Sequence, residues 1–553
     1  MLQNKTKKNH IANLVLLIEI LLQLIGAGFL FFHTYAEGDP VFTFTLANSP
    51  YSYNYVDSKI DRFPGENGWF DSGILREQYM VESYDRFNYS GVYWHQRLDN
   101  HPLLYYSLVH SICSFFPGTY SILYALIINF ISLILIDFLL IRISDFLFEE
   151  RCCACAVIAS STSIVSLQEM IRYARMYMLL ALVCLWFLWI CFKILDQKKG
   201  SGSTSSGKGN KENRRVYAEL GICFLIGSQT HYYFFVFAGI LALLCLVLLI
   251  WEKSFGKIIW SFLSIAMGGC VSLILFPWVI WHILFNQMDK NVTLHLWSLE
   301  EFKEWILFVN ESVCNGRGIL ILIILAVALF LYWAWRRRGN HDLAYVGETK
   351  ENKKPCQEER KGKYWALIVL SAVLYSMVIF TLNGDSLHYA TPVYLPAALC
   401  MAGIAILLTK ELSHRRWRKN AEGLVSLLIV VVLLGSVSNL FSYYREVSDE
   451  YAEYEEMNAV SQNYADADCI YVASNDDNLF QNLWFELASY DEVKKIYVEE
   501  YEERIVDGAW DNVLKGRQTE GDVIWYLPSD EEIPEGSEVL SEWNGFKAVK
   551  FDA

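Results

Sequence analysis

Charged residues are scarce in this chain of 553 residues, where they make up 19% of the sequence. Soluble domains usually contain about 25%. Hydrophobic residues reach 54% and aromatic residues 15%. This balance excludes an intrinsically disordered chain, which needs low hydrophobicity and high charge, and it argues against a single soluble globular protein. The mean hydropathy of +0.24 is modest for a pure membrane bundle, so a sizeable polar part must accompany the apolar one.

Signatures of several other protein classes are missing as well. Few of the 13 cysteines fall in segments that we expect outside the membrane, so no disulfide framework is implied. Cys152, Cys153 and Cys155 include a C-x-x-C spacing, but no second pair follows, and we do not expect a metal site there. We find no nucleotide-binding loop in the C-terminal region and no solenoid repeat.

The negative charge is concentrated at the C-terminal end of the chain. Residues 443–553 contain 28 Asp and Glu against 8 Lys and Arg, whereas residues 1–442 contain 33 against 38. An acidic region disfavours nucleic acid as a partner, because phosphate binding needs clustered basic residues. Within 443–553, β-branched and aromatic runs alternate with helical patterns, which predicts a small α/β domain. The runs are Cys469–Ala473, Lys495–Val498, Val523–Leu527 and Phe546–Phe551, and the helical patterns are Asn478–Ala488 and Glu499–Leu514.

Long apolar runs fill residues 1–442. Since a helix needs about 20 residues to cross the hydrocarbon core of a bilayer, these runs predict a polytopic α-helical membrane protein with about eleven transmembrane helices. The expected spans are 11–32, 119–143, 154–171, 174–193, 216–230, 233–250, 259–284, 318–335, 365–381, 393–409 and 423–441. The first run has no small-residue cleavage site after it, so we expect a retained anchor.

The charges of the loops predict the orientation of the chain in the plasma membrane. The loops 194–215, 336–363 and 410–419 are basic, and basic loops remain in the cytoplasm. We therefore expect a cytoplasmic N-terminus, a large first extracytoplasmic loop at 33–101, and an extracytoplasmic C-terminal domain at 443–553.

The loop 33–101 is the long exception among short connections, and long ordered loops at a membrane surface are usually functional. It contains ten acidic residues, eight tyrosines and two tryptophans. Tyrosine and tryptophan suit a site that is wet at one end and apolar at the other. They equally suit an aromatic belt at the membrane interface, and the composition of the loop leaves both readings open.

A distinctive motif lies at the end of this loop. Residues 99–106 read Asp-Asn-His-Pro-Leu-Leu-Tyr-Tyr, and a Phe-Pro-Gly turn follows. Pro102 suits the first turn of a helix that Asp99 or Asn100 would cap. The motif resembles that of the polyprenyl-phosphate-dependent GT-C glycosyltransferases, which include protein O-mannosyltransferases and aminoarabinose transferases of the ArnT type.

Four further features resemble this family and occur in the expected order. They are Asp39 just past the first span, the RYARMY segment at Arg172–Tyr177, the Thr-His-Tyr-Tyr run at 230–233, and His388-Tyr389 followed by two prolines. The resemblance is scattered over residues 1–410 and implies a GT-C-like transmembrane domain at 1–442. The chain departs from the usual family pattern in three places, which read Asp39-Pro40, His101-Pro102-Leu103 and His388-Tyr389.

The resemblance implies sugar transfer at the extracytoplasmic face. The donor would be a polyprenyl-phosphate sugar, and the acceptor a hydroxyl or amine of a glycan, a lipid or a protein. Asp39 would act as the general base with Asp99 as a second acid, while cations and hydrogen-bond donors stabilise the leaving phosphate. The other implied residues are His101, Arg172, Arg175, His388 and Tyr389 for the donor phosphate, and Tyr105, His231 and Tyr232 for the substrate.

Structural readings of the same residues stay open. Asp39 and Asp99 would also serve as helix caps. The side chains of Arg172 and Arg175 would extend to the membrane interface. His231 and Tyr232 would pack together in an aromatic belt at that interface. A divalent metal ion is possible, since aspartate and histidine are suitable ligands, but no cofactor is certain.

Functions of other classes remain as alternatives. A transporter or lipid flippase would place charged or broken helices near the bilayer midplane and show an inverted repeat. A non-catalytic membrane scaffold would present the acidic C-terminal region to a partner. Another polyprenyl-linked enzyme, such as a polymer ligase, is a third alternative.

Overall fold

The computed structural model describes residues 2–36, 39–49, 69–99, 101–148, 150–197, 207–286, 297–318, 357–383, 386–413, 418–473, 483–497, 501, 522–533 and 536–552. The contacts divide the chain into two compact units. The first comprises Met1–Gly28, Phe130–Ile171 and Met176–Tyr443, and we call it the helical unit. The second comprises Phe29–Asn129, Arg172–Arg175 and Tyr444–Ala553, and we call it the mixed unit.

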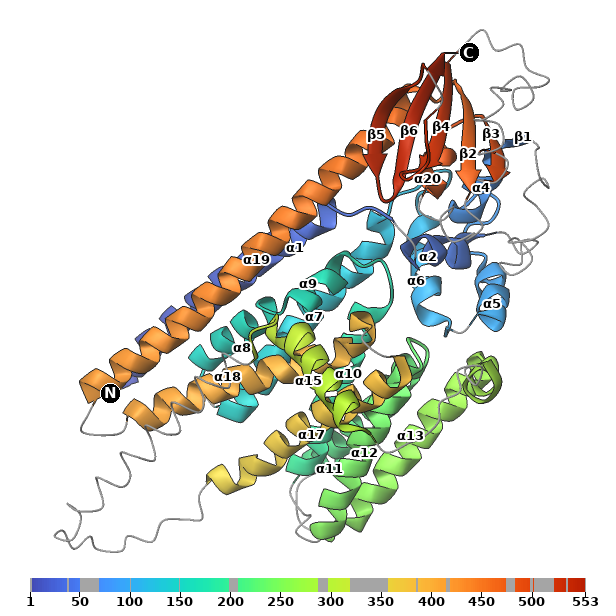
Figure 1. Cartoon of the computed structure of the whole chain (residues 1–553). Coiled ribbons are helices and arrows are strands. Elements are labelled where there is room, and N and C mark those ends of the chain that lie inside the picture. Colours follow the sequence, from blue (N-terminus) through green and yellow to red (C-terminus); the bar gives the residue numbers. More distant parts are fainter. Residues whose placement is uncertain are drawn as a thin grey trace, which may run out of the picture. The chain divides into compact units, whose positions relative to one another are not determined.

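Long apolar helices make up the helical unit (Figure 1). Its central helix is α10, which packs against α11, α12 and α18 and is buried along most of its length. The helices that lie wholly or partly in this unit are α1 (Leu2–Phe32), α7 (Leu123–Phe148), α8 (Cys152–Thr162), α9 (Val165–Arg172), α10 (Tyr177–Asp196), α11 (Gly207–Ser228), α12 (Tyr233–Trp251), α13 (Phe255–Leu275), α14 (Trp278–Trp281), η1 (His282–Asn286), α15 (Leu299–Cys314), α17 (Gln357–Asn383), η2 (Leu387–Ala390), α18 (Thr391–Ser413) and α19 (Arg418–Asn463).

Seven helical segments among the described residues are long and apolar enough to cross a membrane. The chain is therefore a multi-pass membrane protein. The segments are His10–Phe32, Leu123–Phe148, Tyr177–Asp196, Tyr233–Trp251, Phe255–Leu275, Lys361–Leu382 and Leu387–Ile406.

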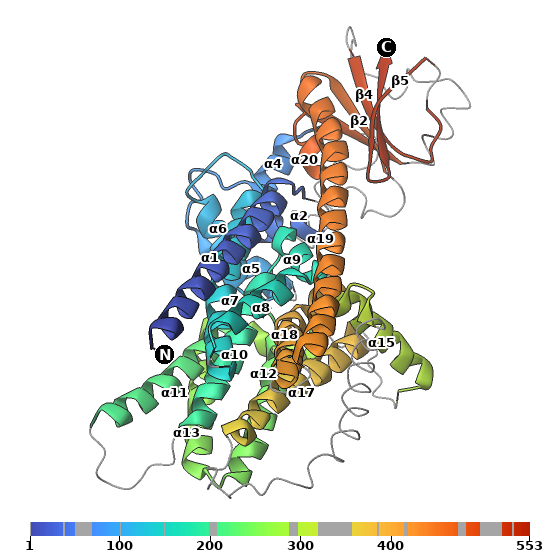
Figure 2. The same ribbon diagram turned by 90° about the vertical axis from the view of Figure 1, so that its left-hand side faces the viewer.

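The remaining four expected spans differ in their outcome. The span expected at 154–171 is the pair α8 and α9, which is bent by 70° and would count as an eighth crossing. The one at 216–230 lies in α11, and the one at 423–441 lies in α19, which Figure 2 shows as one continuous helix. The span at 318–335 lies outside the described residues apart from its first residue. The count of eleven thus stays a prediction.

The side chain of Asn315 forms hydrogen bonds with the backbone groups that are left free at the break between α8 and α9. The Asn315 side chain donates to the Ser163 carbonyl at 2.7 Å and accepts from the Val165 amide at 3.0 Å. A helix interrupted within a membrane is tolerated when another group satisfies the freed backbone. Asn315 therefore stabilises the bend between α8 and α9.

Helices and one sheet form the mixed unit. The helix α2 (Asp39–Asn48) packs against α4 (Gly73–Tyr79), α5 (Tyr89–Leu98) and α6 (Leu104–Cys113). All of α2 beyond its first residue is apolar or carries a short polar side chain, and eight of its residues are buried. The helix is thus fixed from several sides, and Asp39 at its start is held in a defined position.

The sheet has six strands in the order β1-β3-β2-β4-β6-β5. The strand β2 pairs in parallel with β3 and β4, and the other pairs are antiparallel. The edge strand β1 comes from the first loop, whereas the other strands follow residue 443. The strands are β1 (Trp69–Asp71), β2 (Asp468–Ala473), β3 (Glu492–Tyr497), β4 (Asp522–Pro528), β5 (Glu538–Trp543) and β6 (Phe546–Asp552).

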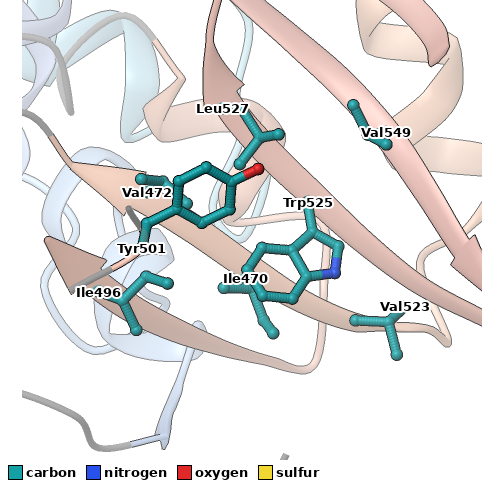
Figure 3. Close-up of a cluster of buried hydrophobic side chains, with 8 residues drawn as sticks. All are labelled: Ile470, Val472, Ile496, Tyr501, Val523, Trp525, Leu527 and Val549. Atoms are coloured by element: carbon teal, nitrogen blue, oxygen red, sulfur yellow. The ribbon is translucent and has the colours of Figure 1, made fainter. Parts of the chain in front are cut away.

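One face of this sheet carries a hydrophobic core. Alternate residues of the central strand β4, namely Val523, Trp525 and Leu527, point to the same face, as the period of two along a strand requires. Figure 3 shows them with Ile470 and Val472 of β2, Ile496 of β3, Val549 of β6 and Tyr501.

The fold class of a polytopic helical membrane protein with a small C-terminal sheet is confirmed, whereas a separate domain at 443–553 stays a prediction. The four expected strands correspond to β2, β3, β4 and β6. The short helix α20 (Trp484–Leu487) falls in the first expected helical pattern, and nearly all of the second lies outside the described residues. The strand β5 was not predicted.

Candidate functional site

Asp39 begins the helix α2, ten residues after the chain enters the mixed unit at Phe29. Pro40 suits the first turn, because the first turn of a helix leaves its amides without intrahelical partners and proline has none to lose. A carboxylate at this end also faces the positive end of the helix dipole. The Asp39 side chain is 42% exposed, so it is accessible to a substrate.

Two side chains of the segment Arg172–Arg175 contact this carboxylate. The Tyr173 hydroxyl donates a hydrogen bond of 2.9 Å to Asp39 Oδ2. Arg175 Nη2 lies 3.7 Å from the same oxygen, and the Arg175 side chain is only 6% exposed. A phenol donor and a largely buried cation both stabilise the negative charge of Asp39.

The segment Arg172–Arg175 is held in place through its backbone as well. The Thr43 hydroxyl, one helical turn after Asp39, donates to the Ala174 carbonyl at 2.8 Å. The Asn129 amide group donates to the Tyr173 carbonyl at 2.7 Å. The helix that carries Asp39 and the segment that holds its carboxylate are therefore bonded to each other at more than one point.

Arg175 also connects Asp39 to the Tyr-Tyr pair of α6. Its Nη1 donates to the Tyr106 hydroxyl at 3.1 Å. Tyr105 and Tyr106 are completely buried, with their rings 5.7 Å apart in an edge-to-face arrangement. Burial holds the pKa of Tyr106 well above its usual value, although the Arg175 charge acts in the opposite direction. Tyr106 is therefore a neutral phenol that orients the guanidinium.

Asp99 and His101 form a pair beside Tyr106. His101 Nδ1 lies 2.6 Å from Asp99 Oδ2, each side chain is 17% exposed, and the His101 ring lies 6.1 Å from that of Tyr106. A carboxylate on one ring nitrogen fixes the orientation of an imidazole and directs the other nitrogen away. The pair thus presents His101 in one defined orientation.

The expectation that Asp99 caps a helix beginning at Pro102 is wrong. Asp99 is the C-cap residue of α5, where its amide donates to the His95 carbonyl. The next helix, α6, begins at Leu104, and its N-cap residue Leu103 offers no side-chain hydrogen bond. Because its carboxylate is not used as an N-cap, Asp99 is able to pair with His101.

The residues Asp39, Asp99, His101, Tyr106, Tyr173 and Arg175 together form what we call the Asp39 site. All of them belong to the mixed unit. Arg172 and Tyr105 lie in the same unit, Tyr105 in contact with Tyr106. Sequence reasoning did not single out Tyr106 or Tyr173 as site residues, although both lie within the motifs that carry the resemblance.

The other predicted site residues gather in the helical unit. The His388 ring lies 4.8 Å from that of Tyr177 and 4.1 Å from that of Tyr389. The His231 ring lies 5.6 Å from that of Tyr177 and 6.2 Å from that of Tyr389. Residues from three distant parts of the sequence thus form a histidine cluster, consisting of Tyr177, His231, His388 and Tyr389.

Tyr232 points to a different partner from its neighbour His231. Its hydroxyl and His282 Nδ1 lie 2.6 Å apart, and His282 is completely buried in the π-helical turn η1. Sequence reasoning missed His282. Two features of the sequence could have pointed to it: a polar histidine in an otherwise apolar span, and Pro277 shortly before it, which favours an irregular turn. Irregular turns within helices are frequent at functional positions.

One group of side chains has the spacing of metal ligands. Among the described residues, the group of side chains close enough to share an ion is Glu150, Cys152 and Cys153. Asp39, Asp99 and His101 are not grouped in this way.

We compared the chain with known proteins. No family model matches, and no curated protein matches. Similar solved structures include the crystal structure of ArnT from Cupriavidus metallidurans in the apo state, with 12% identity, a TM-score of 0.42, and coverage of 87% of this chain and 93% of that chain. The structure of the same protein bound to undecaprenyl phosphate has 12% identity, a TM-score of 0.43, and coverage of 97% of both chains.

Proposed function

We propose that this protein is a membrane glycosyltransferase, which moves a sugar from a polyprenyl-phosphate donor to an acceptor hydroxyl or amine at the extracytoplasmic face. The proposal is carried by the Asp39 carboxylate, which is half-exposed while Tyr173 and Arg175 hold it from the buried side. The class of donor follows from the motif resemblance. The acceptor would be a glycan, a lipid or a protein.

Asp39 is the proposed general base. It accepts the proton of the acceptor group as the acceptor oxygen or nitrogen attacks the anomeric carbon of the sugar. The bond between that carbon and the phosphate oxygen breaks, and the lipid phosphate leaves with the electron pair. One carboxylate suffices for this displacement, whereas glycosidases use two that flank the bond.

Arg175 and His101 are the proposed partners of the donor phosphate in the Asp39 site. A guanidinium offers several donors in a rigid fork, which suits phosphate oxygens. Arg175 is held by Tyr106, and His101 by Asp99, so neither side chain needs to be ordered when the substrate binds. Such preorganisation is the main way in which enzymes stabilise developing charge. For His231, Tyr232, His388 and Tyr389 we retain the predicted binding roles as part of the proposal.

The test replaces the proposed base. Asp39→Asn keeps the shape of the side chain and its ability to accept from Tyr173, but removes the basic carboxylate. We expect sugar transfer from a polyprenyl-phosphate sugar to fall by about 100-fold or more, since general base catalysis contributes about 10² to 10⁴. The matched control is Asp71→Asn, an exposed aspartate of the same loop whose Oδ1 accepts from the Gly73 amide.

Two outcomes would refute the proposal. Unchanged transfer by the Asp39→Asn variant, at normal expression and membrane insertion, would remove Asp39 as the base. An absence of transfer in the unmodified protein would contradict the transferase and is what a scaffold or a transporter predicts.

A further inference from the structure

Glu450 of the helix α19 forms an ion pair within the mixed unit. Arg172 Nη1 and Nη2 lie 3.2 Å and 3.3 Å from Glu450 Oε2. The Tyr35 hydroxyl donates to the same oxygen at 3.4 Å, and the Arg172 guanidinium lies 5.4 Å from the centre of the Tyr35 ring. Residues from three parts of the sequence therefore meet at this carboxylate.

This ion pair is more sheltered than a surface salt bridge. The Arg172 side chain is 10% exposed, whereas that of Glu450 is 42% exposed. An exposed pair contributes little to stability. A pair with one partner withdrawn from water is different, because loss of the exposed partner leaves a buried charge without compensation.

Arg172 is also the first residue of the segment that contacts Asp39. The next residue, Tyr173, reaches Asp39 Oδ2 at 2.9 Å. Since O–H···O hydrogen bonds normally span about 2.5–3.0 Å, a separation larger by about 0.5 Å would take this pair outside the usual range. Because Tyr173 directly follows Arg172 in the chain, a shift of the Arg172 backbone would also displace Tyr173 and lengthen this bond.

We propose that Glu450 is a positioning residue for the Asp39 site, which acts by holding Arg172 and with it the segment Arg172–Arg175. The proposal rests on the proposed function. It gives the acidic C-terminal region an indirect part in the reaction, through Arg172. It also makes Arg172 the partner of Glu450 in place of a ligand of the donor phosphate. Glu450 itself touches no reacting atom.

The first measurement needs no substrate. In the intact purified protein, Glu450→Gln removes the charge and keeps the shape. We expect backbone hydrogen exchange in the peptide that covers Arg172–Arg175 to become about fivefold faster, because local opening is favoured when a holding contact is lost. Glu450→Asp keeps the charge and should restore most of the protection. The control is Glu446→Gln, an exposed glutamate one turn earlier on the same helix.

The second measurement is the kinetics of sugar transfer. If Glu450 positions the segment, Glu450→Gln lowers kcat by about 10- to 100-fold with little change in the KM for the lipid donor, because misplaced groups cost rate more than binding. Glu450→Asp recovers part of kcat. If Arg172 instead binds the donor phosphate directly, Glu450→Gln frees its guanidinium and lowers KM.

The results separate the two proposals. Unchanged hydrogen exchange in Glu450→Gln would overturn the role of Glu450, whatever the activity. A lower KM with unchanged kcat would overturn it as well. Faster exchange in Glu450→Gln together with full activity of Asp39→Asn would leave the positioning contact in place and refute the proposed function.

Discussion

Glu486 offers a sharp test of how the mixed unit is packed. It belongs to α20, is 1% exposed, and its Oε2 has no hydrogen-bond partner among the described residues. A negative charge on Glu486 would raise the pKa of five nearby tyrosines, namely Tyr79, Tyr120, Tyr454, Tyr490 and Tyr526. Burial raises the pKa of each of these phenols, so they remain neutral at ordinary pH.

Burial likewise raises the pKa of Glu486, from 4.5 to about 7. Between these values the folded protein binds a proton that the unfolded chain does not bind. Stability therefore falls as the pH rises through this window and is lowest above pH 7. Each unit of pKa corresponds to about 1.4 kcal/mol, so the complete loss is about 3 kcal/mol.

Glu486→Gln replaces the carboxyl by a neutral group of the same shape. Relative to the unmodified protein, we expect the variant to be more stable by up to about 3 kcal/mol at pH 8 and nearly equal at pH 4.5. Hydrogen exchange of peptides from β2 and β4, compared between variant and unmodified protein at each pH, measures the difference. A difference that does not change with pH would refute the reasoning, and so would a variant that is less stable at pH 8.

Two further substitutions test contacts in the two units. Tyr173→Phe removes the hydroxyl that donates to Asp39, and since hydrogen bonds to charged groups contribute about 1.5–3 kcal/mol, we expect kcat for sugar transfer to fall about tenfold or more. Gly268→Ala would press a methyl group against the Gly221 carbonyl oxygen where α13 meets α11, and we expect about 1–3 kcal/mol of destabilisation by thermal unfolding in detergent. Gly256→Ala on the same helix meets nothing within 4 Å and should be neutral or slightly stabilising.

The outcomes that would contradict these expectations are simple. Tyr84 is 78% exposed, and a Tyr84→Phe variant that loses as much activity as Tyr173→Phe would show that the loss is unspecific. Equal unfolding temperatures for the alanine variants at positions 256 and 268 would show that the helices α11 and α13 accommodate the added methyl group at little cost in stability.

Most of the fold could be predicted from hydropathy and residue type. Apolar runs near the length of a span gave seven helices, and β-branched runs gave four strands. The strand β5 was missed because it is an edge strand that is largely exposed and interrupted by a bulge between Val539 and Ser541. A signal was nevertheless present, since Asn544-Gly545 joins β5 to β6 with positive φ at both residues, which is typical of a tight hairpin.

The strand β1 could not be found in this way. Three residues of the first loop, Trp69–Asp71, pair with β3, which lies more than 400 positions later in the sequence. A run of three residues is too short to show a period, and its pairing depends on an edge that only the folded sheet provides. Composition therefore predicted two separate regions, whereas contacts place them in one unit.

The candidate site shows the same division. Asp39, Asp99, His101 and Arg175 were expected from motifs, and the structure joins them through Arg175 and Tyr106. The roles of these residues remain predictions. Glu450 carried no motif, because one glutamate among the many acidic residues of the C-terminal region is indistinguishable in sequence from its exposed neighbours.

The sequence by itself determined the membrane nature of the chain, the α/β character of its C-terminal region and the kinds of side chain available for chemistry. These properties depend on local composition and on the spacing of apolar residues along the chain. Both can be read without knowledge of any long-range contact. Only the tertiary structure decided which acid meets which arginine. Asp39 with Arg175 and Glu450 with Arg172 are pairs between residues more than 100 positions apart, and their geometry depends on how helices pack, which no local pattern contains.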